Sequence, residues 1–213
     1  MRKLKGADDL PAFYDDLDLS LRAAWSLLAE GAIDRRSPVH VSVVGSIDAK
    51  GLPSQRVMVL READSANHRL RFHTDARAAK VGEFGADGAP VSILAYHPEE
   101  RIQLRLNGHG WIEKDGPAAD AAWAASTNFA KRCYLADPAP GLTVDAPISG
   151  LSAAIEGHKP SDAQVAPART NFAILLVEVE RIEWLYLANA GHRRAVFEWD
   201  TACNRWQCSW LVP

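Results

Sequence analysis

Short runs in which apolar and polar residues alternate recur along most of this chain. Val39, Val41 and Val43, for example, alternate with His40 and Ser42, and a period of two is typical of a strand with one buried face. Further runs of strand character lie at 54–60, 69–74, 91–96, 102–111, 172–179, 182–187, 194–199 and 205–211. Helical runs do not alternate with them, so the pattern predicts a mainly β (α+β) fold, an antiparallel barrel with flanking helices.

Three helical segments are predicted beside the strands. They are residues 10–31, a short helix from the cap Asp75 to about Phe84, and residues 117–129. In the first, apolar residues recur at steps of three and four, and Gly31 stands where a C-terminal cap would end the helix. We expect residues 1–35 to form an N-terminal helical segment packed on a barrel domain of residues 36–213.

Residues 136–170 differ in kind from the rest of the chain. They hold five prolines, several glycines and no clear periodicity, which indicates a long loop within the barrel domain. Loops of this length in compact domains tend to be functional or mobile.

Charge and composition exclude several classes of protein. The formal net charge of the 213 residues is −3, so a broad electrostatic footprint for nucleic acid is not expected. The basic start, Met1–Lys5, is not followed by the apolar core of a signal peptide, and secretion is therefore not expected. No run of about eighteen apolar residues is present, so we expect no membrane span.

The cysteines and histidines do not form a metal or disulfide pattern. Cys133, Cys203 and Cys208 are an odd set without paired-ligand spacing, which argues against a disulfide framework and a structural zinc site and favours a reducing cytoplasm. The seven histidines are scattered, so no metal site is expected. Neither a nucleophile elbow nor a glycine-rich dinucleotide motif is present, which disfavours hydrolysis and dinucleotide binding.

Cationic side chains gather at the ends of neighbouring predicted elements. Arg56 and Arg61 flank one strand, Thr74 ends the next, and Arg77 and Lys80 open the short helix. Arginine forks and lysine point charges suit phosphate oxygens, so these residues predict a site for a phosphate-bearing cofactor. The same residues also fit an ordinary strand with charged ends beside a solvated helix.

These segments, in this order, resemble the pyridoxamine 5′-phosphate oxidase family, whose fold is a split β-barrel that holds FMN between two subunits. The resemblance runs from about Val41 to Pro213. It is carried by Arg56–Arg61, Phe72–Thr74, Lys80, Glu100–Gln103, Glu183–Trp184, Gly191–Arg194 and Trp206–Pro213. The order and spacing of the pieces together make the assignment specific.

The resemblance implies a set of contacts with FMN. They are Arg56, Val57, Met58, Val59, Leu60, Arg61, His73, Thr74, Arg77, Lys80, Gln103, Trp184 and Arg194. In this scheme Arg56, Thr74 and Lys80 hold the phosphate. The backbone of residues 57–60 runs beside the flavin, and Gln103 bonds the polar edge of the ring, because an amide offers both donor and acceptor.

The resemblance also implies a homodimer with the cofactor at its interface. Trp184 and Arg194 would reach across from the second subunit. Arg61 stands where the family has a lysine that contacts the substrate phosphate, and Arg193 matches an arginine over the substrate, so both are candidates for substrate binding. Because Arg56 and Arg61 are five residues apart on one strand, they are expected to point to opposite faces unless a bulge intervenes.

The residues alone leave alternatives open at several of these positions. Lys80 also fits a solvated helix surface, and Arg61 a plain charge at a strand end. Gln103 alternates with apolar neighbours and can face solvent from a strand. Trp184 lies in an apolar run and can belong to the core.

The chain departs from the family pattern at the substrate side. Family members usually carry an arginine just before the lysine at 80, where this chain has Ala79, and Arg77 is the candidate to supply that charge from one turn earlier. A histidine expected over the substrate is Ala195. The oxidase recognises the substrate phosphate with a tyrosine, an arginine and a serine on its second helix, and none of them matches Trp123, Thr127 and Lys131.

The sequence therefore predicts a cytoplasmic, homodimeric FMN-binding oxidoreductase that acts on a small molecule other than the family's vitamin substrate, with no side chain assigned as catalytic. The alternatives are a genuine pyridoxamine 5′-phosphate oxidase and a flavin carrier or sensor, for which the loop at 136–170 would dock a partner. A deazaflavin or haem in place of FMN, and a barrel without ligand, are further alternatives.

Overall fold

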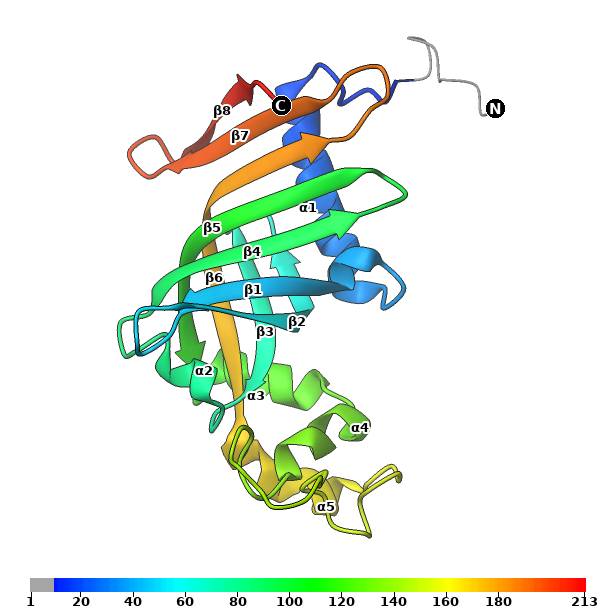
Figure 1. Cartoon of the computed structure of the whole chain (residues 1–213), viewed down its shortest axis with the longest axis vertical. Coiled ribbons are helices and arrows are strands. Elements are labelled where there is room, and N and C mark those ends of the chain that lie inside the picture. Colours follow the sequence, from blue (N-terminus) through cyan, green and yellow to red (C-terminus); the bar gives the residue numbers. More distant parts are fainter. Residues whose placement is uncertain (1–9) are drawn as a thin grey trace.

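The protein is an antiparallel split β-barrel with helices at its sides and one end (Figure 1). The computed structural model describes residues 10–213. The strands are β1 (Val41–Ile47), β2 (Pro53–Asp64), β3 (Arg69–Asp75), β4 (Ala89–His97), β5 (Ile102–Glu113), β6 (Phe172–Tyr186), β7 (Arg193–Asp200) and β8 (Arg205–Leu211). They pair in the order β3-β2-β1-β4-β5-β6-β7-β8, and β3 also pairs with β6, which closes six of them into a barrel. The predicted fold class is confirmed.

Strand β6 is the element that splits the barrel. Residues 172–178 pair with β3, whereas residues 181–186 pair with β7, and β5 runs along the other edge of both halves. The sequence predicts two strands here, but the structure has one continuous strand that exchanges one neighbour for another. At the exchange the register with β5 shifts at Gly108. A Cβ atom there would overlap the carbonyl oxygen of Glu178, so only glycine allows the strands to approach this closely.

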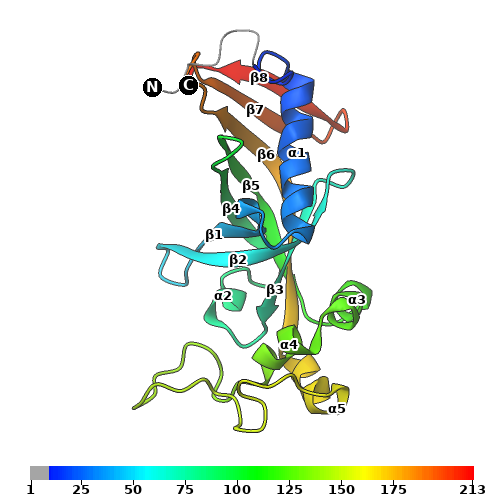
Figure 2. The ribbon, with the colours of Figure 1, turned by 90° about the vertical axis from the view of Figure 1, so that its right-hand side faces the viewer.

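The main core lies inside the barrel and under helix α1 (Leu17–Ile33). Trp25 and Leu28 of the helix share one cluster with Leu60, Phe72 and Trp184 of the strands. Each fully buried side chain of this size contributes about 1.5–3 kcal/mol through the area it removes from water. Figure 2 shows α1 along one side of the sheet, with the opposite face uncovered.

Two predictions about helix ends are wrong. Gly31 does not end α1, which continues to Ile33 and is capped by Asp34. Gly31 is instead buried where Val39 packs against the helix. A Cβ atom at this position would lie 2.5 Å from Cγ2 of Val39, so the close approach requires glycine. Asp75 does not cap a helix either. It belongs to β3, and its carboxylate accepts hydrogen bonds from the backbone and side chain of Arg77.

The remaining helices are short. They are η2 (Pro38–His40), α2 (Ala79–Gly82), α3 (Pro117–Ala125), α4 (Asn128–Lys131), η3 (Arg132–Leu135), α5 (Asp162–Val165) and η4 (Ala166–Asn171). The helix predicted at 117–129 is thus divided, because the Thr127 side chain caps a new turn by accepting from the backbone of Ala130. Helix α3 covers the outer face of β6 through a second cluster that includes Ala119, Ala122 and Phe172.

The segment at 136–170 is largely the long loop that the sequence predicts, with α5 and the start of η4 near its end. Of the N-terminal segment predicted at 1–35, residues 1–9 lie outside the described part of the chain. No helix of residues 10–213 is both long and apolar enough to cross a bilayer.

Candidate functional site

Arg56 is the centre of a polar cluster at one end of the barrel. It points to the inner face of β2, since it pairs with the buried Val44 of β1. Its Nη1 donates to Ser46 Oγ at 2.5 Å, and its Nη2 donates to Ser54 Oγ at 2.8 Å and to Glu83 Oε2 at 2.5 Å. Ser46 and Ser54 also donate to Glu83. We call Arg56, Lys80, Glu83, Ser46 and Ser54 the Arg56 cluster.

Lys80 brings a second cation to this cluster from α2. Its side chain is half-buried, and it makes no ion pair or hydrogen bond with another residue of the described part of the chain. Burial lowers the pKa of Lys80, and the charge of Arg56 lowers it further, against the opposing effect of Asp75 and Glu83. An ammonium held in this way, beside a like charge and out of bulk water, is stabilised by an added anion.

Glu83 does not neutralise the cluster. Burial alone would raise the pKa of Glu83, but hydrogen bonds from Ser46 and Arg56 and the charge of Arg56 outweigh it, and the pKa is lowered. The carboxylate is therefore ionised at neutral pH, which leaves two cations and one anion. A cavity of about 330 Å³ lies on the opposite face of the same strands. It is lined by Gly45, Gln55 and Ser92 among others, and not by Arg56, Lys80 or Glu83.

The other predicted phosphate contacts lie at the end of β3. Thr74 is buried, and its hydroxyl donates to the carbonyl of Asp75 at 3.4 Å. Arg77 does not reach the Arg56 cluster, because it forms a two-bond ion pair with Asp75 at 2.7 and 3.0 Å. The structure therefore does not bring Arg77 to the position of the arginine that Ala79 replaces.

The backbone predicted to run beside the flavin has a free edge. Residues 53–59 of β2 pair with β1, whereas β3 pairs with β2 only from Leu60 onward. On the second edge of residues 57–59, alternate N–H and C=O groups have no strand partner in the described part of the chain, so they can bond a planar polar ligand. The side chains of Val57 and Val59 face outward, and those of Met58 and Leu60 face the core.

Arg61 lies apart from Arg56, in a different set of neighbours. The register shifts at Arg61, and its side chain lies among His73, Tyr134 and Arg35, as their mutual electrostatic effects show. Burial lowers the pKa of Arg61, and burial together with Arg61 and Arg71 lowers the pKa of His73 to about 3. Burial raises the pKa of Tyr134 to about 12. Arg61 and Arg56 therefore lie among different neighbours.

Two nitrogens of this second group have no partner. Nε of Arg61 and Nε2 of His73 are buried and make no hydrogen bond within the described residues. An unpaired buried donor costs about 1–3 kcal/mol. The neutral imidazole of His73 and the guanidinium of Arg61 can therefore bind a polar or anionic group at a small desolvation cost. The rings of Tyr134 and Phe172 line the same site.

Gln103 and Arg194 share the outer face of the sheet. Gln103 pairs with Leu185, which pairs with Arg194, so the three form one row across β5, β6 and β7. Adjacent strands are about 4.8 Å apart, which separates the two polar residues by about 10 Å. A ligand on this face can touch both.

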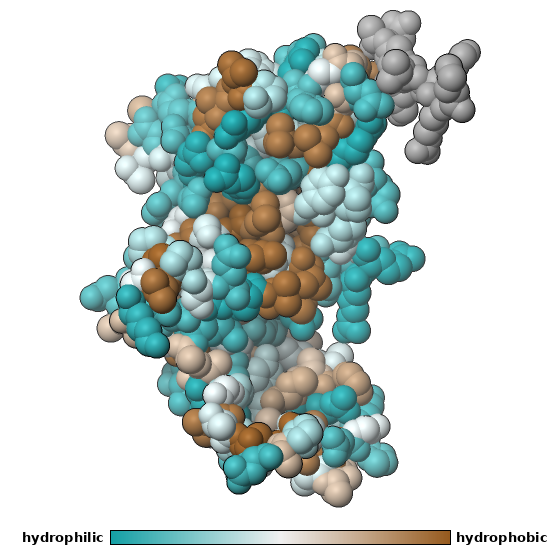
Figure 3. Space-filling view, viewed as in Figure 1, coloured by the Kyte–Doolittle hydropathy of each residue, from teal (hydrophilic) through white to brown (hydrophobic). Residues whose placement is uncertain are grey.

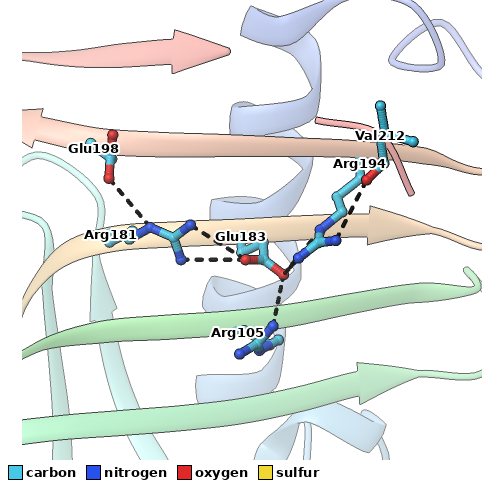
Figure 4. A network of polar contacts seen from close by, with 6 residues as sticks. All are labelled: Arg105, Arg181, Glu183, Arg194, Glu198 and Val212. Atoms are coloured by element: carbon cyan, nitrogen blue, oxygen red, sulfur yellow. Dashed lines mark hydrogen bonds and ion pairs between the residues drawn. The ribbon is translucent and has the colours of Figure 1, made fainter. Parts of the chain in front are cut away.

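Arg194 is held by a buried carboxylate (Figure 4). Glu183 Oε1 accepts from Arg194 at 2.8 Å and from Arg105 at 2.9 Å, and its Oε2 accepts from Arg181 at 3.3 Å. Arg181 also pairs with Glu198. Burial would raise the pKa of Glu183, but the hydrogen bond from Arg194 and the charge of Arg105 outweigh it and lower the pKa. We call these five residues the Glu183 network.

Trp184, a predicted flavin contact, and Arg193, a candidate for substrate binding, both have partners within the chain. The Trp184 side chain is 0% exposed and packs on Phe13 and Tyr186 in the core, which favours the alternative that it is a packing residue. Arg193 pairs with Asp15 at 2.6 Å and lies over the ring of Tyr14. It is committed to the segment before α1 and is separate from Arg61.

Sequence reasoning missed the two carboxylates that organise these sites. Glu83 stands three residues after Lys80, a spacing that suggests a pair with that lysine, whereas its partner in the structure is Arg56 of β2. Glu183 had no such signal, because its partners Arg105 and Arg194 come from two other strands. Among residues 10–213 no group of three or more acidic, histidine or cysteine side chains is arranged to hold a metal ion.

Comparison with known proteins finds similar chains in one family. Residues 22–114 match the family model of the pyridoxamine 5′-phosphate oxidase FMN-binding domain. A pyridoxine/pyridoxamine 5′-phosphate oxidase from Ruegeria sp. (strain TM1040) is 25% identical over 202 residues, which cover 94% of this chain and 96% of that protein. One named pyridoxine/pyridoxamine 5′-phosphate oxidase 2, from Arabidopsis thaliana, is 28% identical over 176 residues, or 78% of this chain and 84% of that one.

Solved structures show the same fold. A pyridoxamine 5′-phosphate oxidase-related, FMN-binding protein from Nostoc punctiforme superposes with a TM-score of 0.72 at 22% identity, over 96% of this chain and all of that one. PhzG from Burkholderia lata, in complex with tetrahydrophenazine-1-carboxylic acid, gives a TM-score of 0.69 at 20% identity, over 98% of this chain and all of that one. The predicted family resemblance and the split barrel are confirmed.

Proposed function

We propose that this chain, which is similar to the pyridoxamine 5′-phosphate oxidase-related FMN-binding proteins, is a homodimeric, cytoplasmic FMN-dependent oxidoreductase. Lys80 is the observation that carries the proposal. It is a half-buried cation beside Arg56 with no anionic partner in the described part of the chain. A phosphate monoester supplies the missing charge and accepts hydrogen bonds from both side chains.

The residues present fit FMN beyond its phosphate. The free edge of residues 57–59 starts next to Arg56 and offers backbone donors and acceptors to the ring. Gln103 offers an amide on the outer face of the same barrel, and Arg194 offers a guanidinium on that face of the second copy. Bound there, FMN would supply the redox chemistry by accepting a hydride at N5.

The protein's own residues would bind and orient. Arg56 and Lys80 would fix the phosphate end, Glu83 and the two serines would hold Arg56 in one rotamer, and the backbone of 57–59 would set the plane of the ring. Preorganised groups of this kind bind without a further cost of ordering their side chains. Arg194 would approach the ring from the second subunit, with Glu183 fixing its direction.

An apolar strip on the outer face supports the homodimer. Val57, Val43 and Leu94 form one row across β2, β1 and β4, and the exposed Val41 and Tyr96 lie beside it. Figure 3 shows apolar side chains gathered at the centre of this face. An exposed strip of this kind on an ordered sheet is typical of an interaction surface.

The substrate would bind at Arg61 and His73. Their unpaired buried nitrogens support a polar or anionic substrate group at this position. A neutral His73 can donate or accept one hydrogen bond but brings no charge at neutral pH, so Arg61 would supply the attraction. Arg193 is bound to Asp15 and would join the substrate only by leaving that ion pair.

FMN binding is tested with the purified full chain. The protein should copurify with a yellow ligand identified as FMN by mass spectrometry, or take up FMN with one site per chain after the ligand is removed. A deazaflavin or haem would show itself in the absorption spectrum and the ligand mass. A colourless protein that ignores added FMN would contradict the proposal.

Two other functions are kept as alternatives. The names of the relatives from Ruegeria and Arabidopsis favour pyridoxine/pyridoxamine 5′-phosphate oxidase activity, whereas Ala195 and the altered α3–α4 region disfavour it. Formation of pyridoxal 5′-phosphate from pyridoxamine 5′-phosphate decides between them. A flavin carrier would bind FMN but show no fast reduction by any small substrate, including aromatic carboxylic acids.

A further inference from the structure

The loop at 137–150 forms an arm that stands away from the rest of the chain. Its ends are close together, since the backbone N–H of Asp137 donates to the carbonyl of Gly150 at 2.8 Å. Every residue from 140 to 149 is exposed. The base is fixed, because Asn171 Nδ2 donates to the carbonyl of Tyr134 and Arg132 donates to that of His158. The arm is thus a compact loop presented from an ordered base.

The arm carries apolar side chains that residues 10–213 leave uncovered. Leu142 is 62%, Val144 43% and Ile148 58% exposed. Three large apolar side chains on one short loop are costly to leave in water, at about 25 cal/mol for each Å². An arm with this composition is typical of a segment that docks on another surface.

The surface that fits the arm lies on the same side of the molecule. Figure 2 shows the arm projecting to the side of the β1–β2 hairpin, away from α1. The apolar strip of Val41, Val57, Leu94 and Tyr96 also faces away from α1 (Figure 3). Because two copies that meet with these sides facing each other have a twofold axis between them, each arm would point toward the strip of the other copy.

Charge complementarity favours the same pairing. The only charged residues of the arm are Asp137 and Asp145. The apolar strip ends at Arg105, the most exposed arginine of the Glu183 network, whose three arginines outnumber their two carboxylates. A segment that is apolar and acidic therefore matches a strip that is apolar with a basic margin.

We propose that the arm of each copy docks on the outer face of β1, β4 and β5 of a second copy of this chain, with Leu142, Val144 and Ile148 on its apolar strip. The inference rests on the homodimer proposed above and assigns to this loop the task of joining the subunits. Each arm then covers part of the face on which Gln103 lies, so the partner helps to enclose the cofactor site.

The first test removes the apolar contacts of the arm. The triple variant Leu142→Ser, Val144→Ser, Ile148→Ser should fold normally, because these side chains are exposed within one chain. Its dimer dissociation constant, from sedimentation at several concentrations with saturating FMN, should rise at least about a hundredfold. The control is Ile33→Ser, a still more exposed apolar residue at the end of α1, which should leave the constant unchanged.

The second test locates the docked arm. In a Cys133→Ser, Cys203→Ser background, one batch carries Val144→Cys and another Leu94→Cys. After mixing, a short bismaleimide should join the two kinds of chain, whereas Val144→Cys and Ile33→Cys chains should not be joined.

The outcomes separate this inference from the proposed function. A wild-type dimer that holds FMN, with an unchanged constant in the triple variant and no Val144–Leu94 product, overturns the arm's role alone. A cross-link within one chain, in a protein that carries both cysteines, would show that the arm folds onto its own barrel and would overturn it too. A wild-type protein that is monomeric and ignores FMN overturns both proposals.

Discussion

Two clusters of arginines and carboxylates occur in this barrel, and they are built for different ends. In the Glu183 network a buried carboxylate receives hydrogen bonds from Arg105, Arg181 and Arg194, and each guanidinium has a partner. In the Arg56 cluster the carboxylate of Glu83 satisfies Arg56, but Lys80 beside it pairs with no other described residue. Both clusters carry excess positive charge, yet only one holds an unpaired cation.

The two clusters differ in whether each cation has an anionic partner, and we infer that an unpaired cation indicates a ligand site better than the net charge of a cluster does. A network in which every cation is paired has nothing to gain from a further anion except long-range attraction, which salt screens. A half-buried ammonium next to a like charge has its largest gain from an anion at contact distance. We therefore propose that the Arg56 cluster binds the phosphate and that the Glu183 network holds β5, β6 and β7 together.

The largest effect is expected when the carboxylate of the paired network is removed. Glu183→Ala would leave three neighbouring arginines without their common acceptor and should lower the free energy of unfolding by about 2–4 kcal/mol. Urea unfolding followed by tryptophan fluorescence measures it. Glu183→Gln, which keeps the shape and part of the hydrogen bonding, should cost less. If Glu183→Ala lowered the free energy of unfolding by less than about 0.5 kcal/mol, the network would have no structural role.

A somewhat smaller but double effect is expected at the centre of the other cluster. Arg56→Ala should weaken FMN and also lower the free energy of unfolding by about 1–3 kcal/mol, because the largely buried Glu83 loses its partner. The double variant Arg56→Ala, Glu83→Ala should recover part of the stability and none of the FMN affinity. If the double variant recovered both the stability and the FMN affinity, Arg56 would serve only to pair with Glu83 and would not bind the phosphate.

The unpaired lysine should make FMN binding depend on pH. The phosphate would raise the pKa of Lys80 from its lowered value in the free protein. Affinity is then constant while Lys80 is protonated in both states, and it falls by up to about tenfold for each pH unit between the free and bound pKa values. Titrations above neutral pH, where the phosphate is a dianion, measure this. Lys80→Arg should abolish the dependence, and an equal slope in that variant would assign it to another group.

The smallest effect is expected at Arg77. Its guanidinium is held by Asp75 at 2.7 and 3.0 Å, so Arg77→Ala should leave FMN affinity unchanged and alter the free energy of unfolding by about 0.5 kcal/mol or less. Isothermal titration with FMN checks it. A marked loss of affinity would mean that Arg77 leaves Asp75 when FMN binds and replaces the arginine missing at Ala79.

The strands could be predicted because their signal is local. The alternation of apolar and polar residues predicts that Ile102, Leu104 and Leu106 face the core, whichever strands pair with this one, and all three are buried. The continuity of β6 could not be predicted, because Glu180 and Arg181 lie where the strand changes from β3 to β7. These two polar residues interrupt the apolar run in the sequence, although the strand itself continues through them.

Site residues could be predicted only where they match a family pattern or stand at a short, regular spacing in the sequence. Arg56 and Lys80 come together as the sequence predicts, and the residues predicted to contact FMN otherwise remain predictions. The burial of Trp184 depends on Phe13 and Tyr186, and the ion pair of Arg193 on Asp15, a residue far away in the chain. Contacts of that kind leave no local pattern in a single sequence.

The most direct test compares two flavins that differ only in the phosphate. Wild-type protein and Lys80→Ala are titrated with FMN and with riboflavin, with the exposed Lys114→Ala as the control. The account predicts that Lys80→Ala loses about 1.5–3 kcal/mol of binding free energy for FMN, about tenfold to a hundredfold in affinity, and almost none for riboflavin. An equal loss for both flavins, or no loss for FMN, would contradict it.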